Sequence, residues 1–165
     1  MNHRLLATYL NDHYAASVGA VQLARRAAGS NRGTAYGEVL SALATEIDED
    51  RATLRLIMQR LDIPPDRVKA ALAWSAEKLG RLKLNGQLSG YSPLSRVVEL
   101  EALALGINGK LALWRTLDRL PRAGAELADF DLPELIRRAE RQLEQLETHR
   151  LQAVTDAFGA KAPSV

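Results

Sequence analysis

The stretch from residue 37 to residue 61 combines a helical apolar pattern with an acid at its centre, and it constrains the fold more than any other part of the chain. Asp50 falls in the middle of the apolar face, and Glu46 lies at its edge one turn earlier. A buried carboxylate without a partner is costly, so the sequence predicts polar partners for Asp50 on neighbouring helices. The apolar residues recur at helical spacing: Leu40, Leu43, Ile47, Leu54, Ile57 and Leu61.

The composition is that of an ordinary globular protein. Hydrophobic residues make up 47% of the 165 residues and charged residues 25%, which is a typical mixture. The net charge is +2, with Lys and Arg spread along the chain, so a nucleic-acid-binding surface is not expected. The absence of Cys excludes disulfides, thiolate metal sites and Cys nucleophiles, and it is consistent with a reducing compartment.

The sequence predicts a soluble, cytoplasmic protein. No apolar run approaches the ~20 residues that a membrane-spanning helix needs. The first residues do not form the apolar core of a signal peptide, because Asn11, Asp12 and His13 interrupt it. We therefore expect no contact with a membrane.

Apolar periodicity predicts four long helices and one shorter helix. The long helices are expected at residues 4–28, 35–61, 93–120 and 132–158, and the shorter one at 67–82. Glycine- and proline-containing breaks separate them, with Thr34 and Ser92 as predicted N-caps. We expect one domain over residues 1–158 and a frayed tail at 159–165.

The lengths of the connections predict how the helices are arranged. The short turn after the first helix and the short loop before the last one each favour an antiparallel pair. The connection from 62 to 92 is long enough to return along the bundle, which leaves the second and third long helices parallel. Two antiparallel pairs joined by a long crossover resemble the ferritin-like bundle. The expected fold is therefore all-α: a ferritin-like up-down bundle of four long helices, with an additional helix in the crossover.

The positions of four ionisable residues predict a polar layer inside this bundle. His13 and Asp50 lie equally far from the first turn, and Glu101 and Arg150 lie equally far from the loop before the last helix. Residues equally far from the turn of an antiparallel pair lie at the same height. Each long helix is therefore expected to contribute one residue to a salt-bridged layer in the middle of the bundle, and such a layer requires no cofactor.

The resemblance to ferritin-like proteins implies a metal site that this chain does not reproduce. That family places a Glu on each of two helices and a Glu-x-x-His motif on each of the other two. Here Arg150 occupies the position where the motif would place His, and an arginine cannot ligate a metal. The alternative is a divergent iron or manganese site, formed by His13, Glu46, Asp50 and Glu101.

These observations favour a non-catalytic bundle that acts through its surface as an interaction or assembly module. The alternative function is a carboxylate-bridged di-metal protein that binds iron or manganese or acts as an oxidoreductase. A homo-oligomer or a protein partner is expected to use apolar positions outside the main helical stripes. These positions are Val39, Leu56, Leu113 and Leu117.

Overall fold

The computed structural model describes residues 2–66, 91–120 and 126–159 of the chain, and in these residues it contains α-helices and no strand. The helices are α1 (His3–Ser30), α2 (Ala35–Arg60), α4 (Pro93–Asp118) and α5 (Leu132–Phe158). They confirm the four predicted long helices to within about two residues at each end. The additional helix predicted at 67–82 lies outside the described residues, as does the tail beyond Gly159.

Each helix begins where a polar side chain caps its first turn. The Thr34 side chain accepts a hydrogen bond from the Gly37 backbone N–H at the start of α2. Ser92 does the same for α4, which has Pro93 in its first turn. Such residues satisfy backbone N–H groups that have no partner within the helix. The two predicted N-caps are therefore confirmed.

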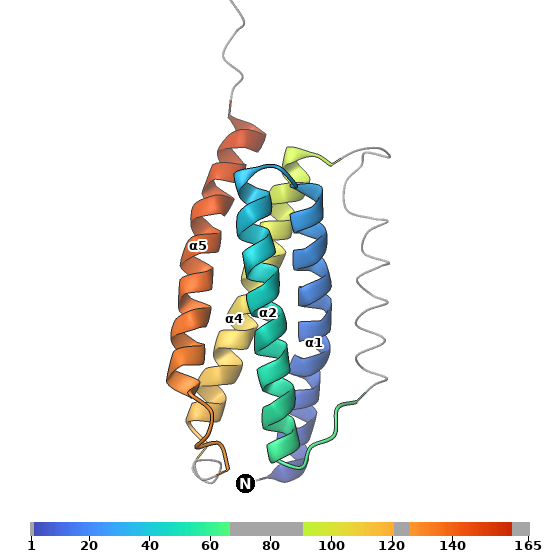
Figure 1. Ribbon diagram of the computed structural model, residues 1–165, viewed down its shortest axis with the longest axis vertical. Helices are drawn as coiled ribbons and strands as arrows, with labels where there is room; N and C mark the ends of the chain where they lie inside the picture. The colour runs from blue at the N-terminus through green and yellow to red at the C-terminus, as the bar shows by residue number, and fades with distance from the viewer. Residues whose placement is uncertain (1, 67–90, 121–125, 160–165) are drawn as a thin grey trace, which may run out of the picture.

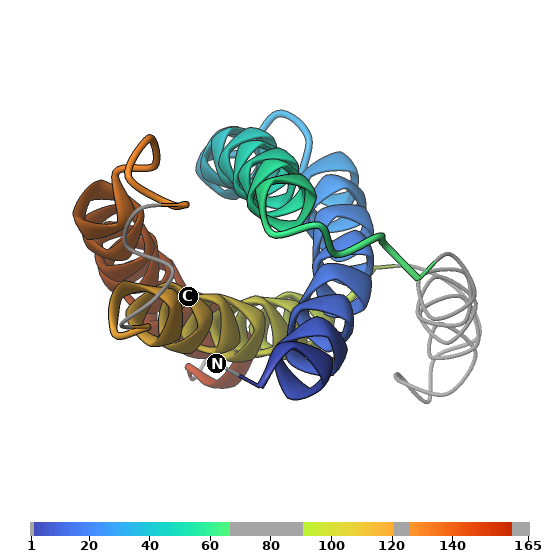
Figure 2. The same ribbon diagram turned by 90° about the horizontal axis from the view of Figure 1, so that it is seen from below.

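The helices pack as a four-helix bundle in which α2 and α4 run in the same direction (Figure 1). Seen along the bundle axis, they follow one another in the order α2, α1, α4, α5 (Figure 2). The closest packing is within the pairs α1–α2 and α4–α5, and α1 joins the two pairs through α4. By contrast, α2 and α5 have the fewest contacts of these neighbours.

Two polar contacts fix the axial alignment of α1 against α4. The Tyr9 hydroxyl lies 3.3 Å from the Thr116 hydroxyl. About 17 residues further along α1, Arg26 Nε donates to Glu99 at 3.2 Å. Position increases along α1 as it decreases along α4, so the two helices are antiparallel.

The core contains the predicted stripe of α2 and a broad side of α4. All six apolar residues of that stripe are buried, as is Trp114 of α4. Leu113 and Leu117, which the sequence suggested for a partner surface, are buried as well. The reason is that α4 packs against both α1 and α5, so it buries more of its circumference than one apolar stripe.

A hydrogen-bonded cluster joins the upper ends of the helices in Figure 1. The buried Asn31 side chain donates to the Tyr91 hydroxyl at 2.7 Å and accepts from Arg96 Nε at 2.7 Å. Arg96 also lies over the Tyr36 ring, 4.2 Å from its centroid, and forms an ion pair with Asp156. This cluster ties the α1–α2 turn to the start of α4 and the end of α5.

Candidate functional site

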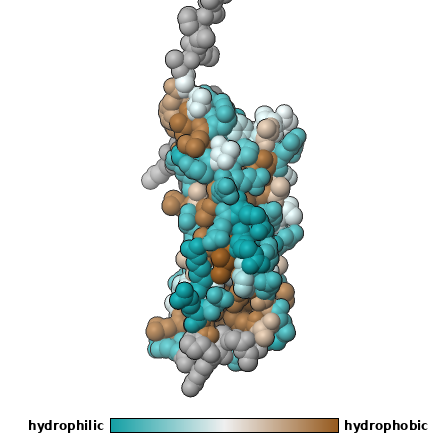
Figure 3. Space-filling view, turned by 90° about the vertical axis from the view of Figure 1, so that its left-hand side faces the viewer, coloured by the Kyte–Doolittle hydropathy of each residue, from teal (hydrophilic) through white to brown (hydrophobic). Residues whose placement is uncertain are grey.

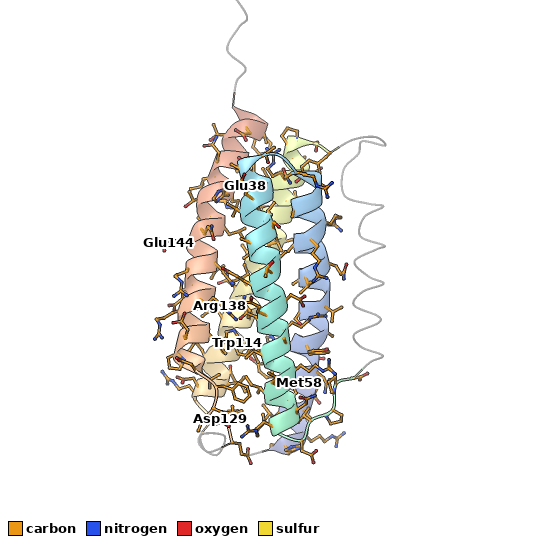
Figure 4. All side chains as sticks on the ribbon, viewed as in Figure 1. Glu38, Met58, Trp114, Asp129, Arg138 and Glu144 are labelled. Carbon is orange, nitrogen blue, oxygen red and sulfur yellow. The ribbon has the colours of Figure 1, made fainter. Side chains whose placement is uncertain are left out.

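The most distinctive polar site is built around Asp50, whose side chain is 3% exposed. Lys110 Nζ of α4 donates to one carboxylate oxygen of Asp50, and an Arg138 guanidinium N–H of α5 donates to the other. Arg138 lies between α5 and α2 (Figure 4). Two cations from two different helices therefore hold the central carboxylate of α2.

Neutral and acidic side chains extend this contact into a network. Gln142 of α5, itself buried, accepts from Lys110 Nζ and donates to Glu46 at 2.7 Å. Arg138 also donates to Glu49 at 3.2 Å. The network thus extends from the core to Glu49, which is exposed to solvent. It connects α2 to α5 through several hydrogen bonds along the length of the two helices.

Burial sets the electrostatics of the cations. The Lys110 side chain is 13% exposed and that of Arg138 is 22% exposed. Loss of hydration lowers the pKa of Lys110, and the negative charge of Asp50 opposes this shift. Charges taken out of water are tolerated when they are paired and hydrogen-bonded. Removing Asp50 would leave two poorly hydrated cations without their carboxylate.

A cavity of about 220 Å³ lies beside this network, between α1, α2 and α4. Its lining is mostly apolar and includes His13, Asp50, Lys110 and Trp114. Burial lowers the pKa of His13, with Asp12 acting in the opposite direction. The imidazole is therefore neutral at neutral pH, and its charge does not compete with Lys110 and Arg138 for Asp50.

The structure brings the four residues of the predicted layer together as two separate pairs. His13 and Asp50 line the same cavity. Arg150 lies 3.6 Å from Glu101, whose side chain is 52% exposed, and binds Glu147 on its own helix at 2.7 Å. The expected layer is corrected accordingly: Lys110 and Arg138, not Arg150, are the cations at Asp50.

The axial alignment of the two helix pairs explains this correction. The contact between Arg26 and Glu99 places Glu101 level with about residue 24 of α1. His13 lies about eleven residues from that level, or ~16 Å along the axis at ~1.5 Å per residue. The lengths of the connections predict which residues of α1 and α2, or of α4 and α5, lie at the same height. They do not determine the axial offset between the α1–α2 pair and the α4–α5 pair.

The alternative metal set is also dispersed. Glu46 is bound by Gln142, Asp50 is bound by Lys110 and Arg138, and Glu101 lies near Arg150. In residues 2–66, 91–120 and 126–159, no three His, Asp or Glu side chains are grouped so that they could hold a metal ion.

Sequence reasoning missed Lys110, Arg138 and Gln142, although the pattern contained a signal for each. Gln142 falls within the apolar stripe of α5, between Ala139 and Leu146, as Asp50 does in α2. Arg138 is one turn before Gln142. Lys110 is the only charged residue between Glu101 and Arg115. A polar residue within an apolar stripe, and a single charge in an otherwise uncharged stretch of helix, were the sequence signals that could have revealed the network.

A second, open hollow of about 1100 Å³ lies along the outer side of α1 and α2. Its lining contains as many arginines as acids, namely Arg25, Arg32 and Arg51 against Glu38, Asp48 and Glu49. Arg25 lies 2.6 Å and Arg51 2.5 Å from the carboxylate oxygens of Asp48. This hollow therefore offers no concentration of one sign of charge to a ligand.

Comparison with known proteins does not assign the chain to a family. No protein-family model, curated protein or solved structure matches the chain. Among the helices that the structure describes, none has the length and apolar character needed to cross a bilayer.

Proposed function

We propose that this chain is a non-catalytic helical-bundle protein that acts as an interaction or assembly module. In this proposal an ion-paired core takes the place of the metal site of ferritin-like proteins. The observation that carries it is the engagement of both Asp50 carboxylate oxygens by Lys110 and Arg138. A carboxylate held by two protein cations has little negative charge left for a metal ion.

The connectivity of the bundle supports a ferritin-like arrangement as part of this proposal. The parallel course of α2 and α4 (Figure 1) requires a long crossover between them. A ferritin-like bundle with one long crossover has this connectivity. We include the additional helix expected at 67–82 in the proposed fold.

The surface of the bundle gives the interaction role some support. The face that carries α5 is mostly hydrophilic across its middle, with hydrophobic atoms towards both ends (Figure 3). Leu151 is 53% exposed and Phe158 65% exposed near the end of α5. Single exposed apolar residues are ordinary, so association requires a direct test.

Metal analysis tests the metal-free core. The protein is expressed in medium supplemented with iron and manganese, purified, and analysed for both metals. We expect much less than one equivalent per chain and no change in unfolding free energy on addition of a chelator. Two equivalents of iron per chain, lost in Asp50→Ala, would instead establish the di-metal function.

Light scattering over a wide concentration range tests association separately. An assembly module is expected to gain mass as concentration rises. A monomer mass at every concentration would contradict self-assembly. The proposed interaction would then have to be with a different protein.

A further inference from the structure

The 220 Å³ cavity between α1, α2 and α4 combines an apolar wall with an unused hydrogen-bond donor. The wall includes aliphatic side chains such as Ile47, Leu54 and Leu113. Trp114 (labelled in Figure 4) also lines the cavity and is only 1% exposed. Among the residues that the structure describes, no acceptor lies within hydrogen-bonding distance of Trp114 Nε1. An indole N–H can only donate, and a buried donor without an acceptor is costly. An acceptor inside the cavity would remove this cost.

The charged side chains that line the cavity are already paired within the protein. Asp50 and Lys110 bind each other, and Arg51 lies 2.5 Å from Asp48. His13 also lines the cavity, and it is neutral at neutral pH because burial lowers its pKa. A charged ligand would therefore enter an apolar space without a counter-ion, which is strongly unfavourable. The chemistry of the lining favours an uncharged ligand.

The volume of the cavity sets the size of the ligand. A cavity of ~150 Å³ lined by apolar side chains binds benzene. In proportion, a cavity of 220 Å³ has room for about nine non-hydrogen atoms. The lining residues Ala16, Leu105 and Gly106 are exposed, so the cavity opens at the outer side of α1 and α4. A small molecule can enter there without separating the helices.

We propose that this cavity binds a small uncharged aromatic molecule whose carbonyl oxygen accepts a hydrogen bond from Trp114 Nε1. An aryl ketone or aldehyde has the required size, an apolar ring and a single acceptor. Aromatic rings gain from edge and offset contacts with other rings beyond the area they bury, and both Trp114 and His13 line the cavity. A rigid ring also loses little conformational freedom on binding. This site is separate from the interaction role proposed above.

Indole N–H signals in ¹⁵N NMR of the full chain test the hydrogen bond directly. The chain has two tryptophans, and the signal that is missing in Trp114→Phe belongs to Trp114. The two probes are acetophenone and α-methylstyrene, in which a CH₂ group replaces the carbonyl oxygen. We expect acetophenone to move the Trp114 indole proton downfield and saturably, with a Kd of about millimolar or tighter. We expect α-methylstyrene to bind without this downfield shift.

Dissociation constants of the two probes give an independent measurement. Trp114→Phe removes the donor and also enlarges the cavity, but the enlargement affects both probes. The difference between the two effects therefore isolates the hydrogen bond. We expect Trp114→Phe to weaken acetophenone at least ~five-fold more than α-methylstyrene, as the loss of a hydrogen bond requires. Ligand-observed NMR measures the binding, and circular dichroism establishes that the variant is folded.

Two glycine substitutions test the location of the site. Gly109 lines the cavity, and a Cβ atom added there would meet nothing within 4 Å. Gly109→Leu therefore fills part of the cavity, and it should weaken acetophenone at least ~ten-fold by overpacking. Gly29→Leu is the matched control, because Gly29 is a helical glycine that lines the outer hollow of α1 and α2 instead. This control should bind acetophenone as the parent does.

Several results would overturn the proposal. Acetophenone might give no saturable shift of the Trp114 proton up to its solubility limit, or Trp114→Phe could weaken both probes equally. Equal weakening by Gly109→Leu and Gly29→Leu would place the binding outside this cavity. Benzoate has the same ring and a carboxylate in place of the ketone, so binding as tight as that of acetophenone would contradict an uncharged ligand. None of these outcomes depends on whether the protein associates.

Discussion

Asp50 of α2 and Arg138 of α5 form an ion pair between the two neighbouring helices that pack least closely against each other in the bundle. The other helix contacts of the bundle bury mainly apolar side chains, whereas this seam is joined by Asp50, Arg138, Glu46 and Gln142. Lys110 adds α4 to the same contact. The network therefore joins α2 to α5, where few other contacts hold the bundle together. Its disruption should affect the whole fold.

Removing Asp50 is expected to be the most damaging change to the network. Asp50→Ala leaves Lys110 and Arg138 without their shared carboxylate, and breaking a buried pair on one side costs ~3–5 kcal/mol. The measurement is the free energy of unfolding in urea. Arg150→Ala is the matched control and should change stability little, because exposed ion pairs contribute little and Arg150 pairs with exposed Glu101 and Glu147.

The relative size of the two losses decides between the observed network and the layer expected from sequence. A loss of several kcal/mol in Arg150→Ala, with little change in Asp50→Ala, would support the expected layer. The observed network predicts the opposite result, in which Asp50→Ala loses more unfolding free energy than Arg150→Ala.

Most of the fold could be predicted from the sequence, because local rules determine it. The stripe of α2, the caps at Thr34 and Ser92, and the connection lengths gave four helices and their directions. Asp50 was recognised as buried because an acid interrupts an apolar face. Its partners were not recognised, because they depend on the axial offset between the α1–α2 and α4–α5 pairs. That offset is fixed by contacts such as Tyr9 with Thr116, which no spacing in the sequence reveals.

The pH dependence of stability should report on Lys110. Burial lowers its pKa in the folded protein below the value of 10.5 expected in the unfolded chain. Between these two values the unfolded chain binds more protons, so stability rises with pH. We expect the free energy of unfolding of the parent, relative to Lys110→Met, to increase as pH rises through the lowered pKa towards 10.5.

Urea unfolding of both proteins at a series of pH values provides the measurement. Tyrosines are common to the parent and the variant, so their titration cancels in the difference. A difference that stays constant with pH, or that falls, would contradict a lowered pKa at Lys110.

Tyr91 should be the last tyrosine to ionise. Burial, with the nearby Glu99 carboxylate, raises the pKa of Tyr91 to about 12, although its hydrogen bond from Asn31 acts against this. Absorbance of tyrosinate during alkaline titration should therefore contain a late component that is absent in Tyr91→Phe. The raised pKa means that stability is lost as pH rises from about 10, the value in an unfolded chain, towards 12. A single transition near the ordinary tyrosine value in the parent would refute this environment.

Two glycines of the α1–α2 region should respond oppositely to alanine. A Cβ atom on Gly37 would lie 2.3 Å from the Asn31 carbonyl oxygen, so Gly37→Ala must displace the turn. Inserting an atom into a packed site costs ~1–3 kcal/mol. Gly29 is in α1, where an added Cβ meets nothing within 4 Å, so Gly29→Ala should be neutral or stabilise by up to ~1 kcal/mol. Thermal and urea unfolding measure both, and equal effects would contradict the tight turn.

The most direct test of the ion-paired core is a double-mutant cycle between Asp50 and Arg138. Urea unfolding is measured for the parent, Asp50→Asn, Arg138→Met and the double variant, each with chelator present. Interacting residues show coupling of ~0.5–3 kcal/mol, and the ion pair predicts a value in the upper half of that range without any metal. Losses that add to within ~0.3–0.5 kcal/mol, as for independent sites, or coupling that requires added iron or manganese, would contradict the account.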